Sequence, residues 1–397
     1  MATMTKTKTV AVTGNQAVAE AFRQLNPDVM PAYPITPSTG IMESFTKFVS
    51  DGKVDTETIL VESEHSAMSA CIGASAAGGR VATATSAQGL ALMWEMLHIA
   101  SGYRLPILMA LVNRALSAPL NIHGDHSDGM GMRDCGWIQI FCENAQEAYD
   151  NTIMAYRIAE HKDVRLPIAV NMDGFIISHS IESMQFMTDE DVKKFVGEYI
   201  AIDPLLDIDN PKSIGALVLP DYYMEHKRAQ HQAMLNVMKV VHDVSAEFAK
   251  LTGRKYDLFE SYRLEDAEVA IVALNSAAGT IKDEIDHYRE KGVKAGLLKP
   301  RMFRPFPYEE VGAALKNAKA VCVMDRADSY GGFGPLFMEI ASAVYPHRQG
   351  PVLFNKIYGL GGRDLMPADV DQVIDEAVEV AKTGKVKLAK EYITVRN

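Results

Sequence analysis

Thr36 lies on a loop that the sequence makes stiff. It stands between Pro34 and Pro37, directly after an apolar run at residues 29–33 that is typical of a strand. Each proline restricts its own φ and extends the residue before it, so neither a helix nor a sheet ladder continues through this loop. The Thr36 hydroxyl could therefore face a ligand at a strand end. A proline-rich turn without a further role is the alternative.

Glu64 follows a second apolar run, at residues 59–61, and begins a predicted helix at 65–77 that is rich in Ala, Ser and Gly. The positive end of a helix dipole favours a carboxylate at this position. A buried carboxylate here could hydrogen-bond a heterocyclic nitrogen of a ligand. A simple helix-end carboxylate explains the pattern equally well.

Arg114 comes directly after Asn113 and a third apolar run, at residues 107–112. A guanidinium at the end of a buried strand needs an anionic partner, and two-pronged recognition of a carboxylate suits its planar geometry. A structural salt bridge is the alternative.

Two other stretches contain residue types that bind ligands in many proteins. His123, Asp125, His126 and Asp128 share one loop, where they could hold a divalent cation or form hydrogen bonds beside an active site. We expect the hydrogen-bonded loop and no metal. Gly331–Gly334 could hold a phosphate at a helix start, but it lacks the lysine of a P-loop, so a tight turn is expected.

The elements that must position these residues alternate between strands and helices. Strands are predicted at residues 29–33, 59–61, 81–85, 107–112 and 167–172, and helices lie between them. Near-continuous apolar strands in this alternation indicate a parallel sheet covered on both faces. Ligands bind at the carboxyl ends of such strands, where Thr36, Glu64, residues 86–88, Arg114 and Asp173 all fall. A further helix at 16–25 is expected to begin with Asn15 as its N-cap.

The second half of the chain divides into a connecting segment and a smaller alternating unit. Residues 185–262 interrupt the alternation with prolines and acidic turns. They contain one long, mostly polar helix at about 222–251, and we expect this segment to wrap a neighbour or partner. Strands and helices then alternate again. We predict an α/β fold with a first parallel-sheet domain at 1–262 and a smaller one at 263–397.

Composition excludes several classes of protein. A net charge of −11 argues against binding to nucleic acid or to anionic membranes. No run of about 18 apolar residues is present, so no membrane span is predicted, and the first residues do not read as a secretory signal. The four cysteines form no C-x-x-C pair, so this chain is not expected to supply an iron–sulfur cluster or a zinc site. Free thiols in the cytoplasm are expected.

A series of short motifs runs in order along nearly the whole chain: YPITPS (33–38), ESE (62–64), TSAQG (85–89), NRALSAP (113–119), GDH (124–126), DGF (173–175), PDYYME (220–225), FRPFP (303–307) and DR (325–326). This series resembles the α subunits of 2-oxoacid:ferredoxin oxidoreductases, and it is most like the pyruvate enzymes of that family. The resemblance implies a thiamine-diphosphate pyrimidine-binding-like domain followed by a transketolase C-terminal-like domain. It also implies oxidative, reversible decarboxylation of a 2-oxoacid in anaerobic metabolism, with the acyl group passed to coenzyme A and electrons to ferredoxin.

The resemblance also assigns roles to individual residues. Glu64 would be catalytic and contact the aminopyrimidine ring of the cofactor, where a carboxylate assists proton transfer. Thr36 and Arg114 would be catalytic and hold the carbonyl and carboxylate of the 2-oxoacid. The expected contacts are, for the cofactor, Glu64, Pro34 and Ile35 and, for the substrate, Thr36, Arg114 and Asn113.

By the same resemblance, this chain holds half of an active site within a heteromultimer. A β subunit would complete the thiamine diphosphate site, and Mg²⁺ and 4Fe–4S clusters would lie on partner subunits. Gamma and delta subunits would carry a coenzyme A-related domain and clusters. No second cationic group follows Arg114 closely, which favours pyruvate. The alternatives are 2-oxoglutarate, a branched-chain 2-oxoacid, oxalate, or a non-catalytic transketolase-like scaffold.

Overall fold

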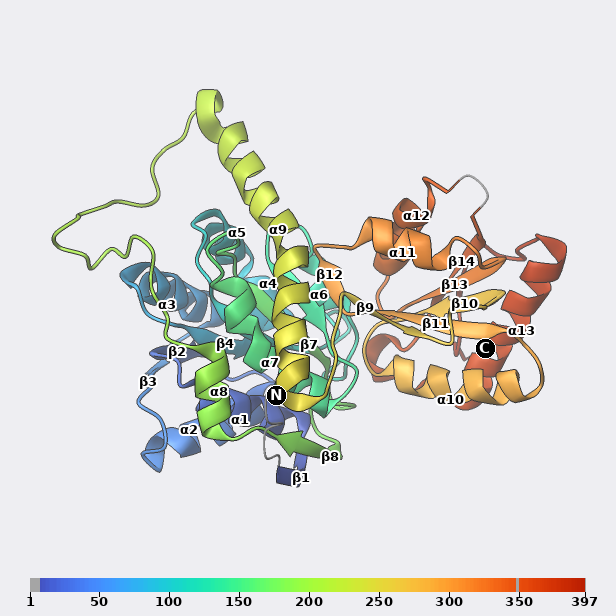
Figure 1. Cartoon of the computed structure of the whole chain (residues 1–397), viewed down its shortest axis with the longest axis horizontal. Helices are drawn as coiled ribbons and strands as arrows, with labels where there is room; N and C mark the ends of the chain where they lie inside the picture. Colours follow the sequence, from blue (N-terminus) through green and yellow to red (C-terminus); the bar gives the residue numbers. More distant parts are fainter. Residues whose placement is uncertain (1–7, 348–349, 397) are drawn as a thin grey trace.

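Two mainly parallel sheets organise the computed structural model, which describes residues 8–347 and 350–396 (Figure 1). The first sheet has the order β12-β6-β7-β5-β4, in which only β12 runs antiparallel to its neighbour. Its strands are β4 Ala82–Thr85, β5 Leu108–Asn113, β6 Ile138–Phe141, β7 Ile168–Asp173 and β12 Met302–Arg304. The predicted α/β class with parallel sheets is therefore confirmed.

Helices cover both faces of the first sheet because successive strand residues point to opposite sides. Leu108, Ala110 and Val112 pack on one face, and the residues between them pack on the other. The first face is covered by α1 Gly14–Leu25, α2 Thr39–Ser50, α7 Ala145–Ala159, α8 Asp189–Val196 and α9 Pro220–Thr252. The second face is covered by α3 Glu64–Ala77, α4 Ala87–Leu92 and α5 Trp94–Gly102. The helical stretch between β4 and β5 is thus two helices that meet at Met93.

Two more strands continue the parallel arrangement beside β4. The pair is β2 Val29–Ala32 and β3 Glu57–Leu60, and a bridge from Val29 to Val81 links it to the β4 segment. The apolar run at 59–61 suggested a buried strand, but this was wrong: β3 is at the edge, and Leu60 is 82% exposed. An edge strand has no neighbour on its far side, so its apolar side chains stay uncovered within this chain.

The start of α1 differs from the prediction. Thr13, not Asn15, is the N-cap, because the Thr13 hydroxyl accepts a hydrogen bond from Gln16 N and the Gln16 side chain binds Thr13 N in return. Asn15 instead lies inside the first turn, and its Nδ2 donates to Pro37 O at 2.9 Å. The residue therefore braces the loop that carries Thr36.

The second sheet has the order β15-β14-β13-β10-β11-β9, parallel except for β9. Its strands are β9 Phe259–Tyr262, β10 Val269–Val272, β11 Ala295–Pro300, β13 Ala320–Asp325, β14 Val352–Ile357 and β15 Lys390–Tyr392. One face packs on α11 Tyr308–Leu315 and α12 Pro335–Val344, and the other on α10 Ala277–Glu290 and α13 Pro367–Thr383. The two sheets exchange strands across the expected boundary at residue 262. β9 ends at that residue but belongs to the second sheet, and β12 follows it but belongs to the first. The exact division into domains stays a prediction.

The connecting segment contains more regular structure than expected. β8 Ile181–Phe186 pairs antiparallel with β1 Lys8–Thr13, and α8 follows. Residues 197–219 form neither helix nor strand, and α9 then projects beyond the rest of the chain (Figure 1). The long helix predicted at 222–251 is confirmed as α9.

Candidate active site

Thr36 lies on a tight turn between β2 and α2. The carbonyl of Ile35 accepts hydrogen bonds from Ser38 N at 2.9 Å and from Ser38 Oγ at 2.7 Å, and Asn15 Nδ2 donates to the carbonyl of Pro37. Pro34 and Thr36 are exposed, and Ile35 is half-buried. The turn therefore fixes its backbone from inside while it presents the Thr36 side chain outward.

Arg114 extends from the end of β5 toward this turn. Its Nη1 donates to the carbonyl of Thr36 at 2.8 Å and its Nε to the carbonyl of Asn121 at 3.1 Å, although the residue is only 7% exposed. Burial lowers the pKa of Arg114 from its ordinary value while the Asp128 carboxylate opposes that shift, and an arginine stays charged. Among described residues no carboxylate forms an ion pair with this guanidinium, so the salt-bridge alternative has no support within the described chain.

Glu64 forms the first turn of α3, where Ser63 is the N-cap and accepts a hydrogen bond from Ser66 N at 3.2 Å. The residue is 6% exposed, yet no described residue donates a hydrogen bond to its carboxylate. It lies against the start of α4: a Cβ placed on Gly89 would be 2.8 Å from Glu64 Oε1 and 2.5 Å from Thr85 Oγ1. Neither oxygen is among the fully enclosed atoms that lack a partner, so the carboxylate keeps an opening through which it can accept a proton donor from outside the chain.

Other polar atoms near this edge also lack partners among the described residues. They are Thr85 Oγ1, Ser86 Oγ, both polar atoms of the Gln88 side chain, and Asn113 Oδ1. Native chains satisfy nearly all buried polar groups, so a group of exceptions at one sheet edge needs an explanation. These atoms follow β4 and β5, beside Glu64 and Arg114. The donors and acceptors they offer fit a polar heterocyclic cofactor.

Asp128 joins these two strand ends and was not predicted to do so. Its Oδ2 accepts hydrogen bonds from Ala87 N and Arg114 N, both at 2.9 Å, and its Oδ1 accepts one from Asn113 Nδ2 at 2.9 Å. Complete burial raises the pKa of Asp128 to about 6, although these hydrogen bonds oppose the shift. Its position within the His123–Asp128 loop was the only sequence signal, and spacing alone could not reveal three partners on other elements.

The other residues of the His123–Asp128 loop point in different directions. The Asp125 carboxylate binds Ser127 N at 3.0 Å, and His126 Nε2 lies 2.8 Å from Asp173 Oδ1. The His123 ring packs on Phe175 at a centroid distance of 4.8 Å. The loop is held by hydrogen bonds, including those of the short helix α6 Ser127–Gly131, as expected.

Asp173, at the end of β7, connects the first sheet to the second. It pairs with Arg326 at 3.1 Å and accepts hydrogen bonds from Ser276 N at 3.1 Å and from the Ser276 hydroxyl. Although burial alone would raise it, the charges of Arg326 and His126 hold the pKa of Asp173 well below its usual range. Asp173 is thus a structural carboxylate between the two units rather than a free ligand group.

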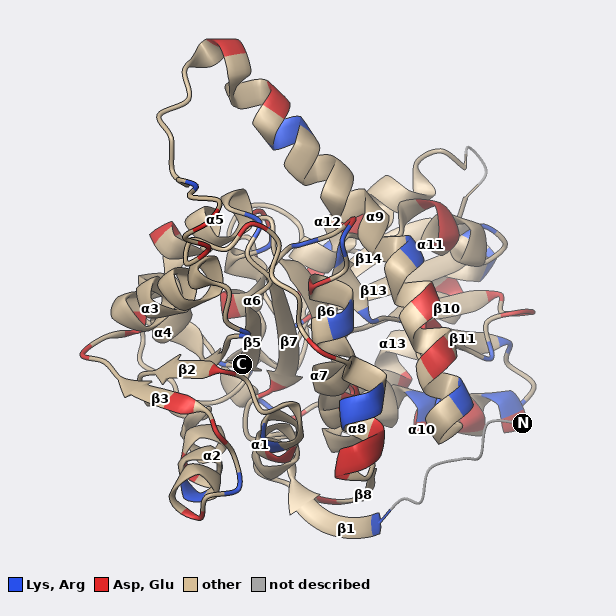
Figure 2. Ribbon diagram, turned by 60° about the vertical axis from the view of Figure 1, so that its left-hand side comes forward, with Lys and Arg blue, Asp and Glu red and all other residues tan. Residues whose placement is uncertain are grey.

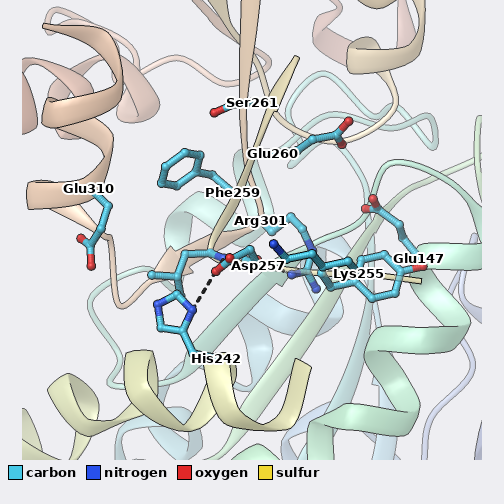
Figure 3. Close-up of a pocket in the computed structure, with 11 residues that line it drawn as sticks. Glu147, His242, Lys255, Asp257, Phe259, Glu260, Ser261, Arg301 and Glu310 are labelled. Carbon is cyan, nitrogen blue, oxygen red and sulfur yellow. Dashed lines mark hydrogen bonds and ion pairs between the residues drawn. The ribbon is translucent and has the colours of Figure 1, made fainter. Parts of the chain in front are cut away.

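One cluster of carboxylates has the spacing of a metal site, but lysines already occupy it. Glu143, Glu147 and Glu260 lie close together, and Lys299 Nζ contacts all three at 2.5–2.7 Å. Burial lowers the pKa of Lys299, but the carboxylates, Glu147 foremost, raise it above its ordinary value. A cavity of about 500 Å³ adjoins this cluster between α7, α9 and β9 (Figure 3). None of the expected site residues lines that cavity.

The Gly331–Gly334 turn leads into α12, as the sequence suggested. The helix start is filled from within, because Asp325 accepts hydrogen bonds from Leu336 N at 2.7 Å and Phe337 N at 3.1 Å. A phosphate has no comparable place here, and the turn is structural.

In the described chain, every cysteine is buried and unbridged, and no helix combines the length and apolar character needed to cross a membrane.

Comparisons with known proteins cover most of the chain. A family model described as "Pyruvate flavodoxin/ferredoxin oxidoreductase, thiamine diP-bdg" matches residues 20–246. A second, "Pyruvate:ferredoxin oxidoreductase core domain II", matches residues 267–370.

Curated relatives agree with these matches. The pyruvate synthase subunit PorA of Thermotoga maritima is 56% identical over 93% of this chain and 94% of its own length. The subunit of the same name from Methanothermobacter thermautotrophicus is 47% identical over 91% of this chain and 94% of its own length. A ketoisovalerate oxidoreductase subunit VorA of Pyrococcus abyssi is 42% identical over 96% of both.

Solved structures are similar in fold. A 2-oxoglutarate:ferredoxin oxidoreductase from Magnetococcus marinus, solved with 2-oxoglutarate, coenzyme A and succinyl-CoA bound, has a TM-score of 0.73 and 20% identity; the match covers 93% of this chain and 65% of that chain. A split-gene transketolase in an inactive β4 tetramer has a TM-score of 0.55 and 12% identity over 93% of this chain and 99% of that chain. At these identities the likeness shows the fold alone.

Proposed function

The chain belongs to the pyruvate:ferredoxin oxidoreductase family, and we propose on this premise that it is the α subunit of a multisubunit pyruvate synthase. The complex converts pyruvate and coenzyme A into acetyl-CoA and CO₂, and passes two electrons, one at a time, to ferredoxin; the reaction is reversible. This chain contributes the pyrimidine-facing half of a thiamine diphosphate site. The observation that carries the proposal is the buried, unpartnered Glu64 carboxylate at the sheet edge where Arg114 meets the Thr36 turn.

Thiamine diphosphate, when bound, supplies a nucleophilic carbon and an electron sink for decarboxylation. Glu64, with the unpartnered groups of Thr85, Ser86 and Gln88, would hold its pyrimidine portion. The Glu64 carboxylate would accept a hydrogen bond from a ring nitrogen and share its proton, which is general acid–base catalysis. Glu64 is 6% exposed, so a bound ring would cover what remains open of its carboxylate.

Arg114 and Thr36 bind the substrate. The guanidinium already uses Nη1 and Nε on backbone carbonyls, and its Nη2 donates to no described residue. Nη2 is free to bind the carboxylate of a 2-oxoacid. The hydrogen bonds of Nη1 and Nε fix the plane of the guanidinium and so the direction in which Nη2 donates. The exposed Thr36 hydroxyl, on the adjoining turn, donates a hydrogen bond to the substrate.

The remaining expected residues have supporting places. Asn113 is fully buried and its Nδ2 binds Asp128 at 2.9 Å and Asn171 Oδ1 at 3.1 Å, so it offers a ligand only its unpartnered Oδ1. Pro34 and Ile35 form the outer surface of the Thr36 turn, where the cofactor ring would contact them.

A 2-oxoacid with a branched apolar tail is the second candidate substrate. The ketoisovalerate subunit relative, at 42% identity, supports it. The loop after Arg114 carries no lysine or arginine up to His126, and it exposes Leu120 and Ile122 at 76% and 41%. This apolar loop disfavours 2-oxoglutarate and oxalate.

The greater identity to pyruvate synthase subunits, up to 56%, favours pyruvate. Turnover rates of the purified complex with each of these 2-oxoacids identify the substrate. Faster turnover of a branched acid than of pyruvate would reverse the assignment.

Partner subunits complete the site. Exposed apolar side chains gather around it and along residues 197–219, where Ile208 and Leu217 are each 88% exposed. This segment and the start of α9 project from the body, and charged residues stand between the exposed apolar ones (Figure 2). Large exposed apolar surfaces mark interaction sites. We assign this surface to a β subunit that brings the diphosphate site with Mg²⁺. Gamma and delta subunits carry the coenzyme A-related domain and 4Fe–4S clusters, and we place the complex in the cytoplasm.

Purification of the complex tests these assignments. The partners should include a chain with two C-x-x-C-x-x-C-x-x-x-C runs, as clusters require. A photo-cross-linker at Leu217 should capture another subunit, and products confined to this chain would contradict the assignment. Pyruvate- and coenzyme A-dependent reduction of viologen should require this chain. If the partners alone were fully active, the non-catalytic scaffold alternative would hold instead.

A further inference from the structure

A turn in the second unit, which is built on the second sheet, contacts the loop that follows Arg114 in the first unit. The short 3₁₀ helix η1, Leu360–Gly362, follows β14. Its Gly361 carbonyl accepts a hydrogen bond from Asn121 Nδ2 at 2.9 Å, and Gly361 N donates to Asp125 Oδ2 at 3.1 Å. These partners are about 240 residues apart in the chain, so only the tertiary fold brings them together.

Asn121 also binds Arg114. Its backbone carbonyl accepts the hydrogen bond from Arg114 Nε at 3.1 Å, while its side-chain Oδ1 accepts one from His123 N at 2.7 Å. The Asn121 side chain is thus fixed by η1 on one side and by its own loop on the other. An unbroken path of hydrogen bonds leads from Gly361 through Asn121 to Arg114 and on to the Thr36 carbonyl.

The approach of η1 is so close that only glycine fits. Gly361 has φ +62° and Gly362 has φ +81°, in the left-handed region. A Cβ on Gly361 would overlap Asn121 Nδ2, and one on Gly362 would overlap the His123 side chain. Because the overlapped atom at Gly361 is the far end of a side chain, a methyl group there would displace Asn121 rather than prevent folding.

We propose that η1 is a positioning element that fixes the guanidinium of Arg114 through Asn121, so that the second unit sets the affinity for the 2-oxoacid carboxylate. The inference rests on the proposed role of Arg114. An arginine side chain has many rotamers, and acceptors that hold it in advance lower the entropy lost on binding. The substrate carboxylate leaves as CO₂, so its contact with Arg114 is strongest in the bound substrate and weakens as the carbon–carbon bond breaks. Misplacing Arg114 therefore weakens substrate binding above all and raises KM more than it lowers kcat.

Gly361→Ala in the assembled complex tests the proposal, with Gly384→Ala as the matched control. Gly384 ends α13 with φ +68° and has nothing within 4 Å of its Cβ position, so it carries the same backbone strain without the contact. We expect Gly361→Ala to raise KM for pyruvate about tenfold with kcat nearly unchanged, because small displacements of positioning groups have large effects. Gly384→Ala should leave KM unchanged.

A double substitution identifies the route. Asn121→Ala removes the side chain that the new methyl group would displace, and it should itself raise KM. Adding Gly361→Ala to Asn121→Ala should then change KM little, since coupled residues are non-additive. Independent, multiplying increases would overturn the path through Asn121.

The outcomes separate this inference from the proposed function. If Arg114→Lys leaves KM unchanged, the proposed role of Arg114 fails. If Arg114→Lys raises KM but Gly361→Ala behaves like Gly384→Ala, the positioning role of η1 is overturned while the function stands. A loss of folded protein would lower the apparent kcat in proportion and leave KM where it was.

Discussion

At the end of β13 in the second sheet, the Asp325 carboxylate accepts hydrogen bonds from Leu336 N, Phe337 N and Asn355 Nδ2 at 2.7–3.1 Å. Asp325 thus binds the first turn of α12 from a strand end, whereas Glu64, which follows β3, is itself the first residue of α3; both residues are buried. No described residue binds the Glu64 carboxylate. Both acids lie near strand ends in two similar α/β layers, but one is satisfied within the chain and the other is not.

The difference in hydrogen-bond partners distinguishes a carboxylate that supports the fold from one that can bind a ligand. A buried carboxylate that gathers its own donors links the elements around it, and the fold closes over it. A buried carboxylate left without donors costs stability and is retained where an external ligand supplies them. The unpartnered Thr85, Ser86 and Gln88 groups beside Glu64 extend the same contrast. We therefore interpret the edge of the second sheet as a structural support and propose the edge of the first sheet as the binding surface.

The largest expected effect is on Glu64. Glu64→Gln removes the proton acceptor, so viologen reduction with pyruvate should fall by about 10²–10⁴-fold, the range of general acid–base catalysis. The melting temperature of the cofactor-free complex should not fall, because the carboxylate has no partner among the described residues to lose. Glu62→Gln, at an exposed carboxylate two residues earlier, is the control and should stay near wild type. Normal turnover of Glu64→Gln would remove the distinction between the two edges.

Arg114→Lys should have the next largest effect. Lysine keeps the charge but cannot bind Thr36 O, Asn121 O and a carboxylate together, so KM for pyruvate should rise by about 10- to 100-fold, as for loss of a charged hydrogen bond. Steady-state kinetics measure it. Arg133→Lys, on the loop toward α9, should leave KM unchanged. An equal rise in both variants would point to a general structural disturbance instead, since both substitutions keep the charge.

A pair of glycine substitutions compares the two edges directly. A Cβ on Gly89 would crowd Glu64 and Thr85, and one on Gly334 would overlap Asp325. We expect Gly89→Ala to reduce activity about tenfold or more, since a displaced catalytic group loses its geometry. Gly334→Ala should instead lower stability by about 1–3 kcal/mol, as for overpacking, with normal kinetics in the folded fraction. Thermal melts and assays on both variants test this, and the opposite pattern would refute the comparison.

The smallest effect concerns pH and stability. Burial raises the pKa of Asp325 from 3.8 to about 7. Between these values the folded state keeps a proton that the unfolded state has released, so the free energy of unfolding contributed by this group falls as pH rises. Asp325→Asn should remove a slope on the order of 1 kcal/mol per pH unit in that window.

Denaturant titrations of the assembled complex between pH 4 and pH 7, a range set by the Asp325 shift, measure this slope. The control is Asp364→Asn, at an exposed carboxylate, which should keep the wild-type slope. A slope unchanged by Asp325→Asn would show that this carboxylate titrates normally in the folded state.

The sequence by itself determined the alternation of strands and helices, because apolar runs and helix periodicity are local properties of the chain. It also placed Thr36, Glu64 and Arg114 at strand ends, since parallel strands share one carboxyl edge. It could not show that β3 lies at an edge, that Thr13 caps α1, or that β12 returns to the first sheet. Each of these depends on which segments become neighbours in space.

Only the tertiary structure decided which polar groups find partners. Asp128 meets Ala87 across about 41 residues of chain, and Asn121 meets Gly361 across about 240. No local pattern encodes such distances, because the hydrogen bonds form only after both sheets have packed. The same packing satisfied Asp325 and left Glu64 open, and that physical difference, rather than residue type, distinguishes the supporting carboxylate from the one that awaits a ligand.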